Sequence, residues 1–511
     1  MATLTGSNYY QKGVELAEAG KYQEGFNCIR EHLQSMPQDV QALNDAGTIL
    51  HCLGRAEDAV AYLIRARELQ SDNPQVIRNL AEAYLGGGMA AEAAQLFPEM
   101  ERMGLLDVEL MNRAATRLLD QDRKGPAVEV LLQSRRLWPE QQVLTPMLEV
   151  IRSKRPKIAF VRNGQGEDGA LADVCEFVEQ RFKTEFCPGR DPQGMADVMR
   201  RHDIVWVDGG GEPAVEASRL ATLGVGRCDA TEGRTAKVIV SLRRSDVGDR
   251  WVRQVRWENV SIVVQIGSSA VEEALVQQVP NIRNRTRLAV VPNGINLSRY
   301  GLRRRERGKH LACLGCLTLE ANPAFLIQCV QKLHYIDPGY KLFFSGAFEN
   351  PGLEQYLRHM VRTLDLTSVV TFERNCGDLN SWLSDKHFTV ASGIGEGQVE
   401  SVLAGMACGL KPVIHNFPGA QRLFPQQYLF NIAEEFCAQV LSQDYQPEQY
   451  RRCVEERYPL DRQLKQVDGI LAQLESEIEW RALAATGTGP AADSSVSNSV
   501  MPAESRVVGK P

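Results

Sequence analysis

The sequence predicts an all-α helical-repeat solenoid in its first third, followed by two α/β halves that are each built on a doubly wound parallel sheet. Two observations support this prediction. Small residues recur every 34 positions through the first 150 residues. After residue 156, short apolar runs rich in strand formers alternate with helical patterns. The length of 511 residues suits about three domains.

Three series of small residues carry the repeat. They are Gly13, Gly47, Ala81 and Ala115; Gly25, Ala59, Ala93 and Ala127; and Gly20, Gly54, Gly88 and Asp122. Small side chains allow two helices to approach closely, and a glycine ends a helix by adopting a left-handed conformation. Pro37, Pro74 and Pro139 fall where the second helix of a repeat should stop. We therefore expect two helices in each repeat.

This period resembles that of tetratricopeptide repeats. The segment AGKYQEGFNCI at 19–29 is similar to the turn and second helix of that family, and the resemblance covers about residues 7–140. It implies a helical domain at 7–145 with a concave surface for a peptide or protein partner. A spacer or a self-association surface is the alternative.

The two α/β halves follow. The run KIAFVRN at 157–163 predicts a strand, and LADVCEFVEQRF at 171–182 predicts the helix after it. Further strands are expected at 203–210, 237–242, 261–267, 310–317, 340–347, 368–373, 387–393 and 411–416. In such sheets, ligands bind beyond the carboxyl ends of the strands.

Several blocks resemble the GT-B glycosyltransferases of family 4 (glycosyl transferases group 1). The stretch AVVPNGINLSRY at 289–300 is similar to the segment between the two domains of that family. The stretch SGIGEGQVESVLAGMACGLKPVIHNFPGA at 392–420 is similar to its E-G loop and the following helix. Residues 338–374 and 449–467 resemble an intervening block and the closing helices, so the resemblance spans about 157–480.

The resemblance implies a GT-B module of two Rossmann-like domains. It places the acceptor-side domain at 156–295, the nucleotide-sugar-side domain at 309–445 and the crossing helices at 446–482, with a hinge near 296–308. The implied activity is a retaining transfer of a sugar from a nucleotide-sugar donor to a protein or glycan acceptor. No metal or other cofactor is implied, and the repeats would recruit the acceptor or a protein partner.

The resemblance also implies site residues. Glu396 falls on the glutamate that holds the sugar hydroxyls and is the first catalytic candidate. The neighbouring backbone at Gly395, Gly397, Gln398 and Val399 would bind the donor, because amides at the start of a helix attract phosphate.

Three family positions differ in this sequence. The second glutamate of the family falls on Ala404, its phosphate-binding arginine on Cys316 and its lysine on Ala321. One charge-assisted hydrogen bond contributes about 1.5–3 kcal/mol, so losing both cations removes roughly 3–6 kcal/mol. A degenerate, non-catalytic GT-B scaffold that binds a partner or a glycan is therefore the alternative function.

Two arginines and one aspartate could complete the site. Arg243 and Arg244 follow a strand of the first half and could face the donor; surface or structural ion pairs with Asp246 or Asp249 are the other interpretation. Asp208 ends another strand and could act as an acid or base on the acceptor side, or could simply form a turn.

Three further positions are weaker donor-site candidates. Gly164 lies in a Gly-rich turn that lacks the third glycine of a nicotinamide-binding fingerprint. Asn293 and Gly294 belong to the interdomain segment, where glycine permits close approach of the backbone. The basic run at 299–309 is typical of a solvated linker. The pair Cys313 and Cys316 lacks a second ligand pair, so we expect core residues and no metal.

Composition excludes several other classes. Lys and Arg total 58 against 64 Asp and Glu, and the net charge of −6 disfavours a nucleic-acid binder. The twelve cysteines show no disulfide framework. We expect no signal peptide and no membrane span, and therefore a cytoplasmic protein. The small, polar segment at 485–511 is predicted to be disordered.

Overall fold

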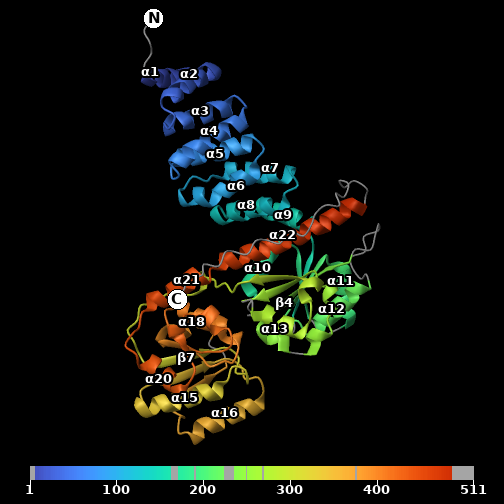
Figure 1. Cartoon of the computed structure of the whole chain (residues 1–511), viewed down its shortest axis with the longest axis vertical. Helices are drawn as coiled ribbons and strands as arrows, with labels where there is room; N and C mark the ends of the chain where they lie inside the picture. Colours follow the sequence, from blue (N-terminus) through green and yellow to red (C-terminus); the bar gives the residue numbers. More distant parts are fainter. Residues whose placement is uncertain are drawn as a thin grey trace, which may run out of the picture. The chain divides into compact units, whose positions relative to one another are not determined.

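The computed structural model describes residues 6–162, 171–188, 192–223, 235–248, 250–267, 270–374 and 377–485. It contains an N-terminal run of helices and two six-stranded sheets (Figure 1). The chain divides into two compact units, one of residues 1–160 and 165–186, the other of residues 161–164 and 187–511. The predicted fold class, a helical-repeat region followed by two α/β halves, is confirmed.

Helices of the first unit stack in the order of the sequence, and each packs on the next (Figure 1). They are α1 (Gly6–Glu18), α2 (Tyr22–Ser35), α3 (Val40–Cys52), α4 (Ala56–Leu69), α5 (Pro74–Gly86), α6 (Ala90–Arg102), α7 (Val108–Asp120), α8 (Lys124–Leu137) and α9 (Leu144–Ser153), followed later in the unit by α10 (Ala172–Arg181). Their inward side chains form one apolar core from Phe26 to Ile151.

The small residues of the repeat act as predicted. Gly20, Gly54 and Gly88 follow the first helices of their repeats with φ of 77°, 73° and 75°, and Asp122 takes the same place with φ of 56°. In the paired positions, a Cβ on Gly25 would lie 2.8 Å from the carbonyl oxygen of Gly13, so α1 and α2 touch through their backbones.

One proline prediction is wrong. Pro37 and Pro139 follow the ends of α2 and α8, but Pro74 is the first residue of α5, well after α4 ends at Leu69. The first turn of a helix does not use its N–H groups within the helix, so proline fits there. Asn73 caps this turn by accepting a hydrogen bond from the amide of Gln75 at 3.0 Å.

The first sheet has the order β2-β1-β3-β4-β5-β6. Its strands are β1 (Ile158–Arg162), β2 (Thr184–Pro188), β3 (Ile204–Asp208), β4 (Lys237–Leu242), β5 (Ile262–Ile266) and β6 (Arg287–Val291). The division between the two units passes through β1 and β2. From β3 to β6 the pairing is parallel, and the register places Asp208 beside Ser241 at the carboxyl ends.

The second sheet is parallel, with the order β12-β11-β10-β7-β8-β9. Its strands are β7 (His310–Leu314), β8 (Lys341–Ser345), β9 (Val370–Glu373), β10 (Phe388–Ala391), β11 (Lys411–His415) and β12 (Leu429–Phe430). Alternation along β7 sends Leu311 and Cys313 into the core under α15 and α16, and Ala312 and Leu314 toward the opposite face. The sequence predicted every strand of this sheet except β12.

Helices of the second unit cover these sheets. They are α11 (Pro192–Arg201), α12 (Glu212–Thr222), α13 (Ala270–Gln278), α14 (Ile282–Arg285), α15 (Pro323–Ile336), α16 (Pro351–Thr363), α17 (Leu379–Trp382), α18 (Val399–Ala407), α19 (Ala420–Leu423), α20 (Ala433–Leu441), α21 (Pro447–Arg457) and α22 (Leu460–Ala485). In the second half, α15 and α16 lie on one face of the sheet and α18 on the other (Figure 1).

The chain passes between the two halves twice, and the two crossings lie together. Ile295 leaves the first half and forms a parallel bridge with Pro459, which leads into α22. The amide of Ile295 donates to the carbonyl oxygen of Tyr458 at 3.1 Å. The halves are therefore joined at one place by two adjacent segments.

The basic run at 299–309 is solvated only in part: Arg299, Arg303, Arg304 and Lys309 are exposed, as the sequence predicted, whereas Arg305 and Arg307 are held by the second half. Arg305 donates to the carbonyl oxygens of Leu383 and Cys408, and burial lowers its pKa. Arg307 donates to the hydroxyl of Tyr340. These arginines fasten the segment onto the second half, because their donors satisfy carbonyl groups that helices and strands leave open.

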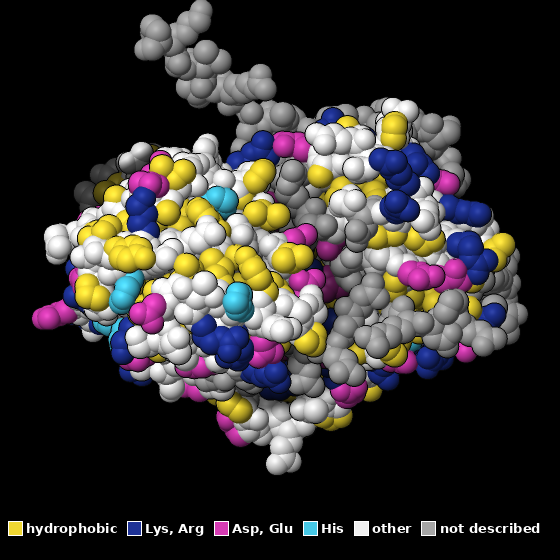
Figure 2. All heavy atoms as spheres, turned by 90° about the horizontal axis from the view of Figure 1, so that it is seen from below, with side chains coloured by type: hydrophobic (Ala, Val, Ile, Leu, Met, Phe, Trp, Pro, Cys, Tyr) yellow, Lys and Arg dark blue, Asp and Glu magenta, His cyan; other side chains and the backbone are white. Residues whose placement is uncertain are grey.

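Two further expectations can be compared with the described residues. Within that part of the chain, no helix is long and apolar enough to cross a membrane. Basic and acidic side chains intermix over the face shown in Figure 2. Except for Ala485, which ends α22, the segment predicted to be disordered at 485–511 lies outside the described residues.

Candidate functional site

The loop that carries Glu396 is held in shape by its own hydrogen bonds. The side chain of Gln398 accepts from the amide of Gly393 at 2.9 Å and donates to Sγ of Cys313 at 3.5 Å. The hydroxyl of Ser392 donates to the carbonyl oxygen of Ala321 at 2.9 Å. Because these partners sit on the core of the second half, the loop has a defined shape before any ligand binds.

Glu396 begins the 3₁₀ helix η6 (Glu396–Gln398) and points at the first half. Gly267, just after β5, has φ of 96°, and a Cβ built on it would lie 3.3 Å from Oε2 of Glu396. The same Cβ would lie 3.1 Å from Nδ2 of Asn293, a buried residue that follows β6. The structure thus brings Glu396 and Asn293 together across the carboxyl ends of two sheets, with Gly267 leaving the room for both.

A second polar group lies at the ends of β3 and β4. Ser241 donates to Oδ1 of Asp208 at 2.9 Å, and Nε1 of the buried Trp206 donates to the hydroxyl of Ser241 at 3.0 Å. Nη1 of Arg243 lies 3.8 Å from the same oxygen of Asp208. A serine hydroxyl and a guanidinium therefore orient the carboxylate of Asp208.

The segment that follows β4 passes near the Glu396 loop. Arg243 is followed by the 3₁₀ helix η1 (Arg244–Gly248), which lies beside η6. The amide of Arg243 donates to the carboxylate of Asp246 at 2.7 Å, while its guanidinium faces Asp208. The side chain of Arg244 and all of Asp249 lie outside the described part of the chain.

Three consecutive glycines form a turn after β3, and the sequence did not show which side chain packs against it. Gly209, Gly210 and Gly211 follow Asp208 with φ of 77°, 67° and 78°. A Cβ on Gly210 would lie only 2.1 Å from the ring of Trp251, so the indole rests directly on the backbone. The triple glycine was the available signal, because a backbone without side chains indicates that something bulky lies against it.

Other predicted residues have mixed surroundings. An added Cβ on Gly395 or Gly397 would meet no atom of the described residues within 4 Å, so that part of the chain leaves the space beside them open. Val399 is buried and starts α18, which leaves only its backbone for a ligand. Gly294 faces protein, since a Cβ there would lie 2.9 Å from Gln463. Gly164 lies outside the described residues.

The structure also shows the surroundings of the three positions where the resembled family has charged residues. Ala321 and Ala404 are buried, and Ala404 packs in the apolar cluster between α18 and α21. Cys316 is exposed, which corrects the expectation that both cysteines of the pair are core residues. Cys313 is a core residue, and burial raises the pKa of its thiol to about 12. Among the described residues, no group of three or more His, Cys, Asp or Glu could hold a metal ion.

Comparison with solved structures identifies the fold. The Anabaena protein HepE, in complex with UDP and glucose, matches with a TM-score of 0.51 at 12% identity, over 62% of this chain and 100% of that chain. The same protein in complex with UDP-glucose matches with a TM-score of 0.49 at 12% identity and the same coverage. The first likeness shows that the two sheets form a GT-B fold.

Comparison with known sequences does not identify a family for this chain. No family model matches the chain. The beta-barrel assembly-enhancing protease of Escherichia coli (strain K12) is 26% identical over 179 residues, which are 34% of this chain and 35% of the protease. The chain thus spans about a third of the length of that relative.

Proposed function

We propose that the protein is a glycosyltransferase that moves a sugar from a nucleotide-sugar donor to a protein or glycan acceptor. One observation carries the proposal. A preformed loop holds Glu396, the residue that matches the sugar-binding glutamate of the resembled family, against Gly267 and Asn293 of the other half. The GT-B fold shared with HepE, which was solved with UDP and glucose, supports a nucleotide-sugar donor.

The residues would divide the work as follows. Glu396 accepts hydrogen bonds from the donor sugar, and the open backbone at Gly395 and Gly397 with the start of α18 receives the phosphate. Arg243 supplies positive charge from the first half. The bond from the anomeric carbon to the phosphate oxygen breaks and the nucleoside diphosphate leaves, a bond to the acceptor oxygen forms with retention, and the acceptor hydroxyl passes its proton to the carboxylate of Asp208. Asp208 orients the acceptor, and no metal is needed.

The repeats and the cell compartment belong to the same proposal. The helical stack would recruit the acceptor or another protein partner, as repeats of this kind expose extended binding surfaces. A cytoplasmic location agrees with cysteines that show no disulfide framework.

A second candidate function is a non-catalytic GT-B scaffold. A specific observation favours it: Cys316, Ala321 and Ala404 replace the charged donor contacts of the resembled family, and two of these positions are buried. The described cation that the first half offers in their place is Arg243, which pairs with Asp208 and directly precedes the η1 segment beside η6. Donor binding decides between the two functions.

Thermal unfolding with UDP, GDP, CDP and dTDP and with their sugars tests the proposal. A ligand at 100 times its Kd raises the free energy of unfolding by about 2.7 kcal/mol. We expect a shift with one nucleotide, and Glu396→Gln should abolish the extra shift of the sugar form while Glu456→Gln, exposed on α21, leaves it unchanged. No shift with any ligand at millimolar concentration would refute the transferase and favour the scaffold.

A further inference from the structure

The edge strand β6 borders a large groove that is separate from the candidate site. The groove has a volume of about 1390 Å³ and takes its lining from β6, from α22 and from the segments around residues 258–262 and 283–286. Small-molecule sites usually enclose about 300–1,000 Å³. Its size and its position along a strand therefore suit a longer, extended ligand.

The outer edge of β6 offers backbone hydrogen-bonding groups. The carbonyl oxygen of Val291 accepts from the amide of Gly267, so Val291 turns its backbone toward β5. Because backbone groups alternate along a strand, Leu288 and Val290 turn theirs the other way. β6 is the last strand in the sheet order, and among the described residues no hydrogen bond reaches these outward groups. Val290 is also 39% exposed.

Helix α22 presents an unusual stripe to the groove. Gln466, Gly469 and Gln473 line the groove at spacings of three and four residues, so they share one face of the helix. Glycine is a poor residue for a helix interior. A Cβ at Gly469 would meet no protein atom within 4 Å, so nothing in the described chain requires glycine there. The glycine instead leaves room beside β6 for the backbone of another chain.

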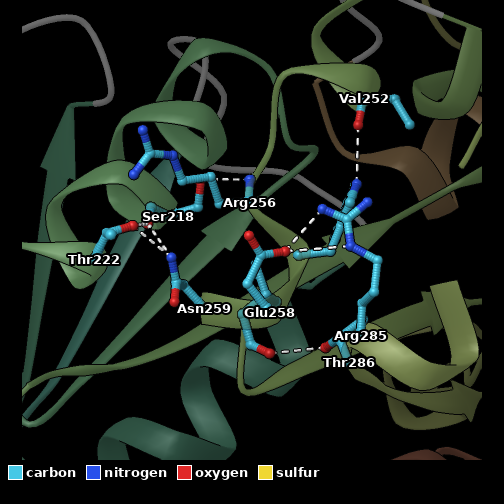
Figure 3. Close-up of polar contacts among 10 residues, drawn as sticks. Ser218, Thr222, Val252, Arg256, Glu258, Asn259, Arg285 and Thr286 are labelled. Atoms are coloured by element: carbon cyan, nitrogen blue, oxygen red, sulfur yellow. Dashed lines mark hydrogen bonds and ion pairs between the residues drawn. The ribbon is translucent and has the colours of Figure 1, made fainter.

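The remaining lining is fixed by internal contacts (Figure 3). Nη2 of Arg285 pairs with Oε2 of Glu258 at 2.8 Å, and the hydroxyl of Thr286 donates to the carbonyl oxygen of Val260 at 2.8 Å. Nδ2 of Asn259 donates to the carbonyl oxygen of Ser218 at 3.1 Å. This part of the groove is therefore preformed and needs little ordering when a ligand binds.

The charges of the groove indicate what it accepts. Arg285 and Arg283 are each paired with a carboxylate of the lining, Glu258 and Glu272. The other two lining cations, Lys237 and Arg287, share a single carboxylate, Glu477, at 2.6 Å each. One positive charge is therefore in excess. Pairing with a second copy would bring two such charges together, whereas an acidic segment would neutralise it.

We propose that the groove between β6 and α22 binds an extended, acidic segment of a partner protein, which adds a strand to β6 at Leu288 and Val290. Backbone hydrogen bonds to the outward groups of β6 would hold the segment. Gly469 would admit its main chain, and Lys237 with Arg287 would face a carboxylate. The site lies apart from Glu396 and does not depend on the proposed transferase activity.

Selection from a phage library of random 12-residue peptides on the full chain tests this proposal. We expect enrichment of acidic peptides, and the best one, made synthetically, should bind at least tenfold more weakly to Gly469→Leu and to Val290→Glu. The matched control is Ala472→Leu, an exposed change on α22 outside the groove, which should alter Kd less than twofold. Hydrogen exchange should slow at the amides of Leu288 and Val290 when the peptide binds.

Three results would overturn the proposal. The first is that no peptide distinguishes the natural chain from the two groove variants, while all three melt cooperatively. The second is that peptides bind only after deletion of residues 486–511, which would assign the groove to the tail of the same chain. The third is a dimer that Val290→Glu dissociates, which would assign it to a second copy.

Discussion

Oε2 of Glu396 and Nδ2 of Asn293 converge on one point, the place where a side chain at Gly267 would begin, at 3.3 and 3.1 Å. The three residues come from different segments, and the two polar side chains meet only because Gly267 carries none. The arrangement of the candidate site therefore depends on a residue that contributes no chemistry of its own.

Gly267→Ala should lower the free energy of unfolding and displace Glu396. The φ of 96° disfavours any side chain by about 1–2 kcal/mol, and the added methyl group would press on both polar groups. Chemical denaturation measures the first effect, and nucleotide-sugar binding measures the second. Gly301→Ala is the control, because that glycine is exposed and its added Cβ would touch nothing. Equal losses in both variants would contradict this role of Gly267.

The stacking of Trp251 on Gly210 predicts a difference between neighbouring glycines. Gly209 and Gly210 have similar positive φ, but only a Cβ on Gly210 would collide with the indole. Gly209→Ala should therefore show only the backbone cost of about 1–2 kcal/mol. Gly210→Ala should cost more and should change the fluorescence of Trp251. If the two variants have the same stability and spectrum, the indole does not pack as described.

The repeat turns predict opposite effects for two substitutions. Gly54→Ala should lower the free energy of unfolding of the helical stack by about 1 kcal/mol, because φ is 73° there. Asp122→Gly should raise it, because Asp122 holds φ of 56° with a side chain that disfavours this conformation. Circular dichroism during thermal unfolding measures both. A loss in each variant would show that the side chain of Asp122 matters more than its backbone.

His387 predicts a dependence of stability on pH. Burial, followed by the nearby charges of His310 and Arg305, lowers its pKa to about 4, from the ordinary value of 6.5. Its Nδ1 faces the amide of His310 at 3.4 Å, as a neutral acceptor would. The unfolded chain therefore binds the proton more tightly, and stability falls as pH drops from 6.5 toward 4.

Removing this histidine should flatten the pH profile. In His387→Asn, stability should be lower at neutral pH, because the ring packs over Gly308, but it should change less between pH 6.5 and 4. His359→Asn, an exposed change, should keep the natural slope. Melting temperatures across that range provide the test, and an unchanged slope in His387→Asn would exclude it as the source.

Helix α22 offers a matched pair for the groove glycine. Gly469→Ala should raise the free energy of unfolding by about 1 kcal/mol, since alanine favours the helix and fits without contact. Ala472→Gly, one turn away and exposed, should lower it by a similar amount. Denaturant unfolding measures both. If Gly469→Ala destabilises the chain, the glycine is needed for the fold itself, and its proposed role of leaving room for a partner segment is contradicted.

Sequence patterns predicted the elements of this fold well because local physics determines them. The left-handed turns at Gly20, Gly54 and Gly88 and the strands of the second sheet each leave a mark within a few residues. The short strand β12 was missed because Leu429 and Phe430 are too brief a run to show a pattern. Pro74 was misplaced because proline suits both the end of one helix and the start of the next.

The candidate site was harder to predict, because its contacts join distant segments. The sequence indicated Glu396 and Asp208, but it could not show that Ser241 orients one of them or that Gly267 makes room for the other. It offered the backbone of Gln398 as a donor contact, but it could not show that the side chain of this residue binds Gly393 and Cys313. Such roles depend on which strand ends the fold brings together. A short stretch of sequence does not show which distant segments will meet.

The double crossing at Ile295 and Pro459 limits how the two α/β halves of the second unit can move against each other. A single connecting strand would let one half swing and twist freely against the other. Two crossings, bonded between Ile295 and Tyr458, must turn together. Any opening of the two halves is thus reduced to a rotation about the line of these crossings. Such a rotation returns Glu396 to the same place beside Gly267 each time the halves close.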